Sequence, residues 1–411
     1  MQKITKQLLI AILLIVFVVA IAVSTWWLWS FYHNNLRGIG PAVNPPSRDI
    51  TQLIDKREAP LNLPAGFSVG IFAKDLGDPR VIVTDPNDVM VVSVPARGQV
   101  IALPDNTGSG VAERQVVLIQ GLNNPHGLAF RCVINKCRLY VAEENALSYY
   151  DYDPIALKAT NRHKLTDLPA GGRHVTRSLL FLPAPNDSQL LVAIGSDCNV
   201  CNEQDPLRAK IMVIGADGGE LKEYAKGLRN SVFQAINPAT KQVWITEMGR
   251  DYLGDDLPPD EINILAQGSN YGWPICYGKN VHDTDFDKNT YFRNPCMEPF
   301  ETPSYINIPA HSAPLGLAFI TGNAWPKDYA NGLFVAYHGS WNRSVPTGYK
   351  VVRYKLGPKG EYQGAEDFIS GWLQADNTAL GRPAGLLTKP NGELFISDDK
   401  AGVIYRVYPT K

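Results

Sequence analysis

Short apolar runs separated by polar turns recur along the chain from about residue 62 to residue 408. Each unit contains a strand of the Gly-Leu-Ala-Phe type, a turn, a second apolar strand, a polar turn and a further strand. The runs are rich in β-branched and aromatic residues, which favours strands over helices. We recognise six such units, with insertions of variable length: Val81–Leu103, Gly127–Asp153, Ser178–Ile214, Phe233–Leu265, Gly316–Leu356 and Gly385–Tyr408.

Repeats of about 40–50 residues, each worth about four strands, indicate a β-propeller. One four-stranded unit cannot bury both of its faces, whereas a ring of stacked units can. The early strand around Phe67–Phe72 is placed to complete the last unit and so to close the ring between the chain ends. The pattern therefore predicts an all-β fold, a six-bladed propeller over residues 62–411, and it favours this over a repeated β-sandwich.

The N-terminal segment has a different pattern. An uncharged apolar run extends from about Leu8 to Tyr32 after Lys3 and Lys6, and about 20 such residues suffice to cross a bilayer as a helix. Tryptophans near its far end fit the aromatic belt of a membrane interface. We expect an uncleaved transmembrane helix, although Ala20–Ala22 also offers a signal-peptidase site, so a cleaved signal peptide is the alternative.

These features predict three parts of the chain: a transmembrane anchor or signal segment over residues 1–33, a proline-containing stalk over 34–61, and the propeller over 62–411. The positive N-terminal flank places the body outside the cytoplasm. We expect a single-pass inner-membrane protein with its propeller in the periplasm, or an exported protein if the segment is cleaved.

The overall composition narrows the class of partner. Hydrophobic residues make up 45% of the 411 residues and charged residues 19%, which is ordinary for a globular protein with a large core. The formal net charge of -1 provides no basic field for nucleic acid, so no such partner is expected. A Gly-rich nucleotide fingerprint does not follow a first strand, so NAD dependence is not expected either.

The six cysteines fall into local pairs, namely Cys132/Cys137, Cys198/Cys201 and Cys276/Cys296. An even number outside the cytoplasm indicates three disulfides, although fifteen pairings are formally possible. The Cys198–Cys201 segment is also a CxxC pattern, which can be a redox pair or a zinc half-site. A second CxxC or a histidine pair does not lie nearby in the sequence, so a loop staple is the favoured interpretation.

Three neighbouring motifs carry the most specific chemistry: Gly227–Asn230, Glu247–Arg250 and Asp260–Pro274. The first places a guanidinium and an amide on one loop, which suits a planar polyanion. The last two combine a tight glycine turn with a carboxylate pair, and clustered carboxylate and carbonyl oxygens suit a hard cation such as calcium.

These motifs resemble the glucose/sorbosone dehydrogenase family, six-bladed propellers that use pyrroloquinoline quinone (PQQ) with calcium. The resemblance covers about residues 62–408. The short-spaced cysteines and the run Gly339–Arg343 look more like the L-sorbosone dehydrogenase branch than the soluble glucose dehydrogenase branch. The resemblance implies a PQQ- and calcium-dependent oxidation of a sugar, either an aldose or a sugar aldehyde such as sorbosone, with electrons leaving to a periplasmic or membrane acceptor.

The resemblance also implies roles for residues of this chain. His174 matches the catalytic histidine and would remove a hydroxyl proton as hydride leaves the same carbon. Arg229 and Asn230 match a pair that contacts the quinone, where a positive charge would stabilise the reduced form. Arg382 is a second candidate for the PQQ carboxylates. The family's cofactor lysine has no clear counterpart, and His338 or Arg343 is a candidate substitute.

Further candidates open other units or lie near the carboxylate pair. His126 and His311 are candidates for substrate or cofactor contact. The resemblance assigns the catalytic calcium to the backbone carbonyls of Gly249 and Arg250, with an arginine where some relatives have proline. A second, structural calcium would involve the remaining metal candidates, which are Asp260, Glu261 and Tyr271.

Two other functions stay open from the sequence. A calcium-dependent lactonase on a similar propeller needs one metal gripped by side chains of several blades, and Glu143, Asn145, Asn230 and Asp398 are candidates. A propeller without cofactor would instead serve as an extracytoplasmic binding scaffold, because a fold alone does not determine function.

Overall fold

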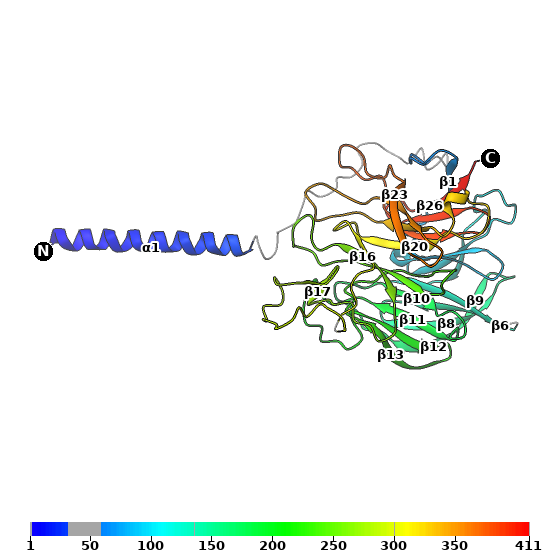
Figure 1. Cartoon of the computed structure of the whole chain (residues 1–411), viewed down its shortest axis with the longest axis horizontal. Helices are drawn as coiled ribbons and strands as arrows, with labels where there is room; N and C mark the ends of the chain where they lie inside the picture. The colour runs from blue at the N-terminus through cyan, green and yellow to red at the C-terminus, as the bar shows by residue number, and fades with distance from the viewer. Residues whose placement is uncertain (1, 32–58, 135, 300, 411) are drawn as a thin grey trace.

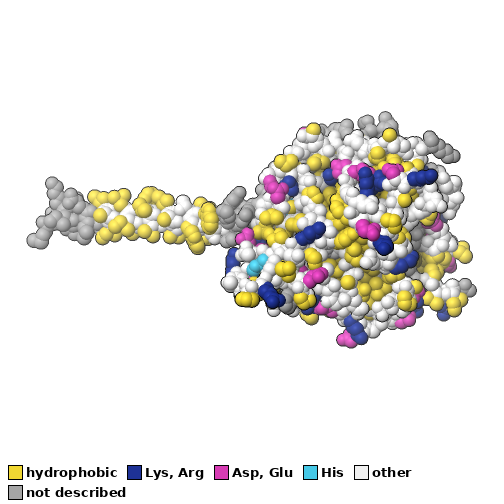
Figure 2. Space-filling view, viewed as in Figure 1, with side chains coloured by type: hydrophobic (Ala, Val, Ile, Leu, Met, Phe, Trp, Pro, Cys, Tyr) yellow, Lys and Arg dark blue, Asp and Glu magenta, His cyan; other side chains and the backbone are white. Residues whose placement is uncertain are grey.

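The computed structural model describes residues 2–31, 59–134, 136–299 and 301–410. The predicted stalk lies outside the described residues apart from residues 59–61. Helix α1 (Gln2–Phe31) contains the 21-residue apolar stretch Ile10–Ser30, which is the one helix in the described ranges long and apolar enough to cross a membrane. Its hydrophobic side chains are exposed and cover the helix surface (Figure 2). The predicted apolar N-terminal helix is therefore present.

The rest of the described chain forms six four-stranded antiparallel sheets arranged around a centre (Figure 1). The first two blades contain β2 (Ile82–Thr84), β3 (Met90–Val94), β4 (Gln99–Leu103), β5 (Val116–Ile119), and β6 (Gly127–Val133), β7 (Lys136–Ala142), β8 (Ala146–Asp153), β9 (Lys158–Asp167). The next two contain β10 (Arg177–Phe181), β11 (Gln189–Ile194), β12 (Lys210–Gly215), β13 (Gly218–Lys226), and β14 (Gln234–Ile236), β15 (Val243–Glu247), β16 (Asp260–Leu265), β19 (Ile306–Ile308). The last two contain β20 (Pro314–Phe319), β21 (Leu333–Tyr337), β22 (Lys350–Leu356), β23 (Tyr362–Ile369), and β24 (Pro383–Thr388), β25 (Leu394–Asp398), β26 (Val403–Pro409), β1 (Phe67–Ala73).

Short elements occupy the connections between the blades. The insertion between β16 and β19 carries a two-stranded sheet of β17 (Cys276–Tyr277) and β18 (Val281–His282). Two 3-10 turns, η2 (Pro95–Arg97) and η3 (Lys327–Tyr329), lie in other loops.

The innermost strands of the six blades are β2, β6, β10, β14, β20 and β24. Residues of these six strands or next to them line one central cavity of about 290 Å³, among them Ile82, Leu128, Leu179, Gln234, Leu317 and Leu386. The inner strands run in the same sense around the ring, so the loops that precede them meet at one mouth. The predicted six-bladed propeller is confirmed.

The two ends of the propeller segment close the ring in one sheet. Strand β1 pairs antiparallel with β26, with Phe67 opposite Pro409 and Ile71 opposite Tyr405. Phe67 also packs edge-on against Phe368 of the preceding blade, with 5.1 Å between ring centroids. The predicted completion of the last blade by the early strand is therefore confirmed.

The predicted cysteine pairs are all bonded in the described residues, as Cys132–Cys137, Cys198–Cys201 and Cys276–Cys296. The first pair joins the facing ends of β6 and β7, and the third joins β17 to the loop that follows β18. The second closes a loop just after β11. Because Cys198 and Cys201 are bonded to each other, the alternative of a zinc half-site is not realised.

Candidate functional site

The candidate site lies at the mouth where the loops before the inner strands converge. A cavity of about 290 Å³ there is lined by residues of three consecutive blades and the loops between them, including the predicted residues His174, Arg229, Asn230, Gly249 and Asp260. Arg173, Asp251, Trp341 and Asn342 also line it and were not singled out from the sequence. The fold therefore brings together side chains that are up to about 170 residues apart in the sequence.

A smaller pocket adjoins this cavity and shares Arg229, Met248 and Gly249 with it. Three other predicted metal residues, Arg250, Glu261 and Tyr271, line this second pocket. The predicted residues His126, His338 and Arg382 line neither of the two and lie elsewhere around the mouth.

His174 is buried in the loop before β10. Its Nδ1 lies 2.8 Å from the carbonyl oxygen of Ser196 and 3.0 Å from the Ser196 hydroxyl. A carbonyl oxygen only accepts hydrogen bonds, so Nδ1 carries the proton and Nε2 keeps its lone pair. Burial, together with the nearby charge of Arg229, lowers the pKa of His174 to about 3. The imidazole is therefore neutral and able to accept a proton at Nε2.

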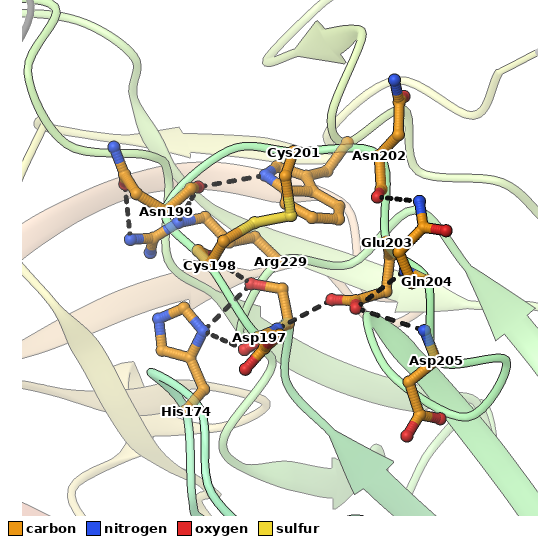
Figure 3. Close-up of a disulfide and its surroundings, with 12 residues drawn as sticks. His174, Asp197, Cys198, Asn199, Cys201, Asn202, Glu203, Gln204, Asp205 and Arg229 are labelled. Atoms are coloured by element: carbon orange, nitrogen blue, oxygen red, sulfur yellow. Dashed lines mark hydrogen bonds between the residues drawn. A yellow bond between two sulfur atoms is a disulfide. The ribbon is translucent and has the colours of Figure 1, made fainter.

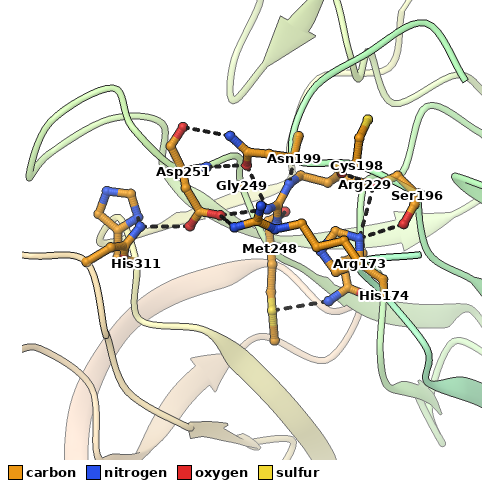
Figure 4. A network of polar contacts seen from close by, with 12 residues as sticks. Arg173, His174, Ser196, Cys198, Asn199, Arg229, Met248, Gly249, Asp251 and His311 are labelled. Atoms are coloured by element: carbon orange, nitrogen blue, oxygen red, sulfur yellow. Dashed lines mark hydrogen bonds and ion pairs between the residues drawn. The ribbon is translucent and has the colours of Figure 1, made fainter. Parts of the chain in front are cut away.

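Arg229 is buried and held from several sides in the loop before β14. Its Nε donates to the carbonyl oxygen of Asn199 at 2.9 Å, and its Nη2 donates to Asn199 Oδ1 and to Asp251 Oδ2, both at 2.9 Å. Burial lowers the pKa of Arg229, and the Asp251 carboxylate opposes this. Arg173 also reaches Asp251 Oδ2, at 3.4 Å, so two guanidinium groups share one carboxylate beside the cavity (Figure 4).

Close backbone packing brings His174 and Asn230 together. A Cβ atom on Gly195 would lie 2.6 Å from His174 Cβ and 2.8 Å from Asn230 Oδ1, so only glycine fits between them. The backbone N–H of Asn230 donates to Glu247 Oε1 at 2.9 Å, and its side-chain amide lies 3.5 Å from Met248 Sδ. The loop before β14 and the end of β15 are thereby tied to each other.

The predicted carboxylate pair, Asp260 and Glu261, is buried. Asp260 accepts hydrogen bonds from the backbone N–H groups of Gly249 and Ala313, both at 2.9 Å. Glu261 accepts from Gly278 N–H at 2.7 Å and from Asn263 Nδ2 at 2.8 Å. Burial raises the pKa of each carboxyl to about 7.

Two further buried glutamates were not predicted. Oε2 of Glu247 and both carboxyl oxygens of Glu301 have no hydrogen-bond partner among the described residues. Burial raises the pKa of Glu247 well above its usual range, and burial together with the charge of Glu261 raises that of Glu301 to about 8. Buried carboxyls without partners are costly unless they are protonated or bind a cation. The sequence around Glu301 does not indicate a buried carboxyl cluster, because Glu261, whose charge acts on Glu301 in the folded protein, lies forty residues earlier.

The side chains of Tyr271 and Arg250 have local protein partners. The Tyr271 hydroxyl donates to the carbonyl oxygen of Ile264 at 2.7 Å and accepts from the N–H of Ala266 at 3.0 Å. Arg250 forms an ion pair with Asp283, with 3.1 Å between Nη1 and Oδ2. Both side chains support the loops of the smaller pocket, which leaves backbone oxygens as the groups they offer to a metal.

A second polar cluster surrounds His338, just after β21. Its Nε2 lies 2.9 Å from both carboxylate oxygens of Asp399, which also pairs with Arg80. Arg382 donates from Nη2 to the carbonyl oxygen of Gly339 at 2.6 Å and from Nε to that of His338 at 3.1 Å. Burial lowers the pKa of His338 to about 4.

The remaining histidine candidates are also buried. Nδ1 of His126 lies 3.3 Å from the carbonyl oxygen of Arg177, and its Nε2 has no partner in the described part of the chain. Burial lowers its pKa to about 3. His311 lines the main cavity and its Nε2 lies 2.7 Å from the carbonyl oxygen of Gly254, whereas Arg343 binds Asp255 and Asp256 outside that lining.

The carboxylates considered for a lactonase metal are already bonded to protein donors. Glu143 accepts from Asn123 N–H and pairs with Arg162. Asp398 accepts from three backbone N–H groups and from Trp372 Nε1 at 2.8 Å. The only group of three potential metal ligands found in the described ranges is Cys276, Cys296 and Glu301, and its two cysteines form a disulfide. These contacts give no support to a metal held by that set.

The sequence model of the TrAA12-like family matches residues 61–410. The chain belongs to the TrAA12-like family. The predicted membership of a family that includes PQQ-dependent sugar dehydrogenases is confirmed. The assignment to the sorbosone branch of such enzymes stays a prediction.

Relatives of this TrAA12-like chain carry informative names. A pyrroloquinoline quinone-dependent pyranose dehydrogenase of Coprinopsis cinerea is 26% identical over 405 residues, covering 84% of this chain and 54% of the relative. The chain spans little more than half the length of the first curated relatives it matches. By name, this relative is an oxidoreductase that acts on sugars.

Solved structures share the fold of the TrAA12-like chain. The Trichoderma reesei protein of Carbohydrate-Active Enzymes Family AA12 superposes with a TM-score of 0.72 at 24% identity, covering 85% of this chain and 98% of the other. The holo form of the PQQ domain of the Coprinopsis cinerea pyranose dehydrogenase gives a TM-score of 0.70 at 22% identity, covering 90% and 99%. At these identities the likeness shows the six-bladed fold alone.

Proposed function

We propose that this protein is a PQQ- and calcium-dependent dehydrogenase of a sugar, an aldose or a sugar aldehyde such as sorbosone. The observation that carries the proposal is the pairing of a neutral His174 with the buried cation Arg229 on the walls of one cavity. A base for the hydroxyl proton and a fixed positive charge near the hydride acceptor are what oxidation of a sugar hydroxyl by hydride transfer requires. The names of the family relatives support this choice.

The residues around the mouth fit PQQ by charge. PQQ carries three carboxylates, and the cavity offers the guanidinium groups of Arg173 and Arg229, which suit planar anions. Asn230 adds an amide. Arg382 and His338 would hold a further carboxylate from the neighbouring cluster, and His126, in the loop before β6, offers a buried Nε2 without a partner in the described chain. We propose that these residues bind the cofactor.

The buried carboxyls fit calcium by the same kind of reasoning. Three carboxyl oxygens of Glu247 and Glu301 lack partners in the described chain, and clustered oxygens are the ligands that calcium prefers. We propose that calcium is held by backbone oxygens of Gly249 and Arg250 and, at a second position, by Asp260, Glu261 and Tyr271. Glu247 and Glu301 would supply negative charge to these sites.

In the proposed reaction, PQQ when bound supplies the two-electron acceptor that takes up the hydride. Nε2 of His174 accepts the proton of the substrate hydroxyl, or of the aldehyde hydrate, while the hydride leaves the same carbon. The charge of Arg229 stabilises the negative charge that develops at the acceptor. Asp251 keeps Arg229 in place, and Trp341 offers a flat apolar face at the mouth to the sugar ring.

The setting of the reaction is also proposed. Helix α1 would anchor the protein in the inner membrane with the propeller in the periplasm, and a periplasmic or membrane cytochrome or quinone would accept the electrons. Disulfides in the propeller agree with an oxidising compartment.

The test uses the full-length chain in detergent, stripped of metal and then titrated calorimetrically with PQQ in the presence and absence of calcium. Dye reduction is measured with a panel of aldoses and sugar aldehydes. Tight, calcium-dependent binding with sugar-dependent dye reduction is the expected result. Absence of PQQ binding would exclude the dehydrogenase, and lactone hydrolysis by the cofactor-free protein would replace it with a hydrolase.

A further inference from the structure

The loop closed by the Cys198–Cys201 disulfide touches the predicted reacting groups through Asn199 (Figure 3). Asn199 accepts two hydrogen bonds from Arg229, at its carbonyl oxygen and at Oδ1, both at 2.9 Å. It also binds Asp251 twice: Oδ1 accepts from the Asp251 N–H at 2.8 Å, and Nδ2 donates to the Asp251 carbonyl oxygen at 3.1 Å. One residue thus holds both members of the Arg229–Asp251 ion pair.

The same loop reaches His174 through its first cysteine. The Ser196 hydroxyl donates to the carbonyl oxygen of Cys198 at 2.7 Å. Because this bond uses its only hydrogen, the hydroxyl presents a lone pair to His174 Nδ1, 3.0 Å away. The Ser196 carbonyl oxygen also accepts from Nδ1, at 2.8 Å. Both contacts favour the tautomer with the proton on Nδ1.

The disulfide-closed loop lowers the cost of holding the Arg229 side chain in one place. An arginine side chain has several rotatable bonds, and ordering it costs conformational entropy. Two bonds to a loop closed by a disulfide supply a rigid reference, because the crosslink restricts the conformations open to the four-residue segment. Trp273 Nε1 donates to the same Asn199 carbonyl oxygen at 3.4 Å and so adds a further tie to the loop.

We propose that Asn199, held by the Cys198–Cys201 disulfide, is a positioning residue that sets the place of Arg229, and that the same loop sets the tautomer of His174 through Ser196. This inference rests on the proposed function for its catalytic meaning. It assigns to the CxxC segment a role beyond that of a loop staple. Asn199 itself does not line the cavity, so it acts through its neighbours.

The first experiment compares Asn199→Ala with Val200→Ala, a matched control in the same loop. Calorimetry with PQQ and calcium should show at least about tenfold weaker binding for Asn199→Ala, because the charge-assisted bond from Arg229 Nη2 to Asn199 Oδ1 is lost. The Val200→Ala protein should bind within about twofold of the parent chain. Dye-reduction kinetics should show an increase in the PQQ concentration needed for half-activity, with the turnover of the saturated enzyme reduced as well.

The second experiment needs no cofactor. In the protein labelled with ¹⁵N-histidine and ¹⁵N-arginine, NMR reports the His174 tautomer and the hydrogen exchange of Arg229 Nη2–H, the group that donates to Asn199 Oδ1. Asn199→Ala should speed that exchange at least about tenfold. Cys198→Ala/Cys201→Ala should give a mixture of His174 tautomers, whereas the control Cys132→Ala/Cys137→Ala should leave the Nδ1–H form.

These readouts separate the two hypotheses. If the parent chain does not bind PQQ, the proposed function fails, and the NMR comparison still decides whether Asn199 positions Arg229. Unchanged Arg229 exchange and unchanged PQQ affinity in Asn199→Ala would overturn the inference. If the double cysteine variant does not fold, the Asn199→Ala comparison decides alone.

Discussion

Arg229 and Asp251 form a buried ion pair, with 2.9 Å between Nη2 and Oδ2 and side-chain exposures of 5% and 11%. Asp251 belongs to the insertion that precedes β16, and it also accepts from Asn342 Nδ2 at 2.7 Å. The insertion thus folds over the loop before β14 and over the loop after β21, and it forms part of the wall of the site.

Removal of this carboxylate should destabilise the protein. Asp251→Ala leaves the Arg229 charge buried without its partner, which costs about 3 kcal/mol in comparable buried pairs. Urea unfolding followed by tryptophan fluorescence measures the change. The control is Asp217→Ala, since Asp217 is 83% exposed in its pair with Arg138, and its loss should cost about 1 kcal/mol or less. Equal effects of the two variants would contradict the structural role of Asp251.

Loss of the proposed base should separate turnover from cofactor binding. His174→Ala removes Nε2 but no cation, so the turnover number should fall roughly 100- to 10,000-fold, the range for general-base removal. The calorimetric affinity for PQQ should change by only about threefold or less. Turnover like that of the parent chain would exclude His174 as the base.

The buried carboxyls predict a linked dependence of stability on pH and calcium. Burial raises the pKa of Glu261 from 4.5 to about 7, and burial together with Glu261 raises that of Glu301 from 4.5 to about 8. The folded protein therefore holds these protons longer than the unfolded chain. Their contribution to stability is present below the unfolded values and is lost as the pH rises through about 7 to 8.

Calcium should offset this loss, because it binds the deprotonated oxygens. Added calcium is expected to raise the melting temperature more at pH 8 than at pH 5, as measured by differential scanning calorimetry. Glu301→Gln should reduce the rise in melting temperature that calcium causes. The buried histidines contribute equally to the variant and to the parent chain, so the difference between the two proteins reports the carboxyl alone. Equal calcium increments at both pH values would argue against a metal at these carboxyls.

Trp341 is expected to affect substrate binding more than turnover. It lines the cavity, is 45% exposed, and packs edge-on against Tyr252 with 6.0 Å between centroids. Trp341→Ala should raise KM for sugars about three- to tenfold, the scale of a single aromatic contact, with a smaller change in kcat. Trp341→Phe should restore part of the affinity. An unchanged KM for every sugar oxidised would place the substrate elsewhere.

The sequence predicted the inner and middle strands of the blades better than the outermost ones. Strands such as β11 (Gln189–Ile194) are apolar runs with five buried residues, and the pattern marks them directly. The outer strand β9 (Lys158–Asp167) is almost entirely polar, with no buried residue. An edge strand that faces solvent on both sides has no hydrophobic alternation, so its pairing with β8 is specified by the neighbouring strand.

The sequence predicted only those site residues that lie in recognisable motifs next to the inner strands. His174, Arg229 and Asn230 lie in such loops, and the structure places them beside one cavity. Asn199 and Asp251 lie in a disulfide loop and an insertion, whose paths depend on contacts made after folding. Their roles depend on the residues that they contact in the folded protein, and a single sequence does not show these contacts.

Because β1 pairs with β26, the ring joins the first strand of the propeller to be synthesised with the last. On a chain made from its N-terminus, β1 stays without its partner until β26 has been synthesised. If α1 is already inserted in the bilayer at that stage, the waiting strand is tethered near the membrane. Closure of the ring therefore requires β26, and truncation before Val403 should leave β1 unpaired and the ring open to proteolysis.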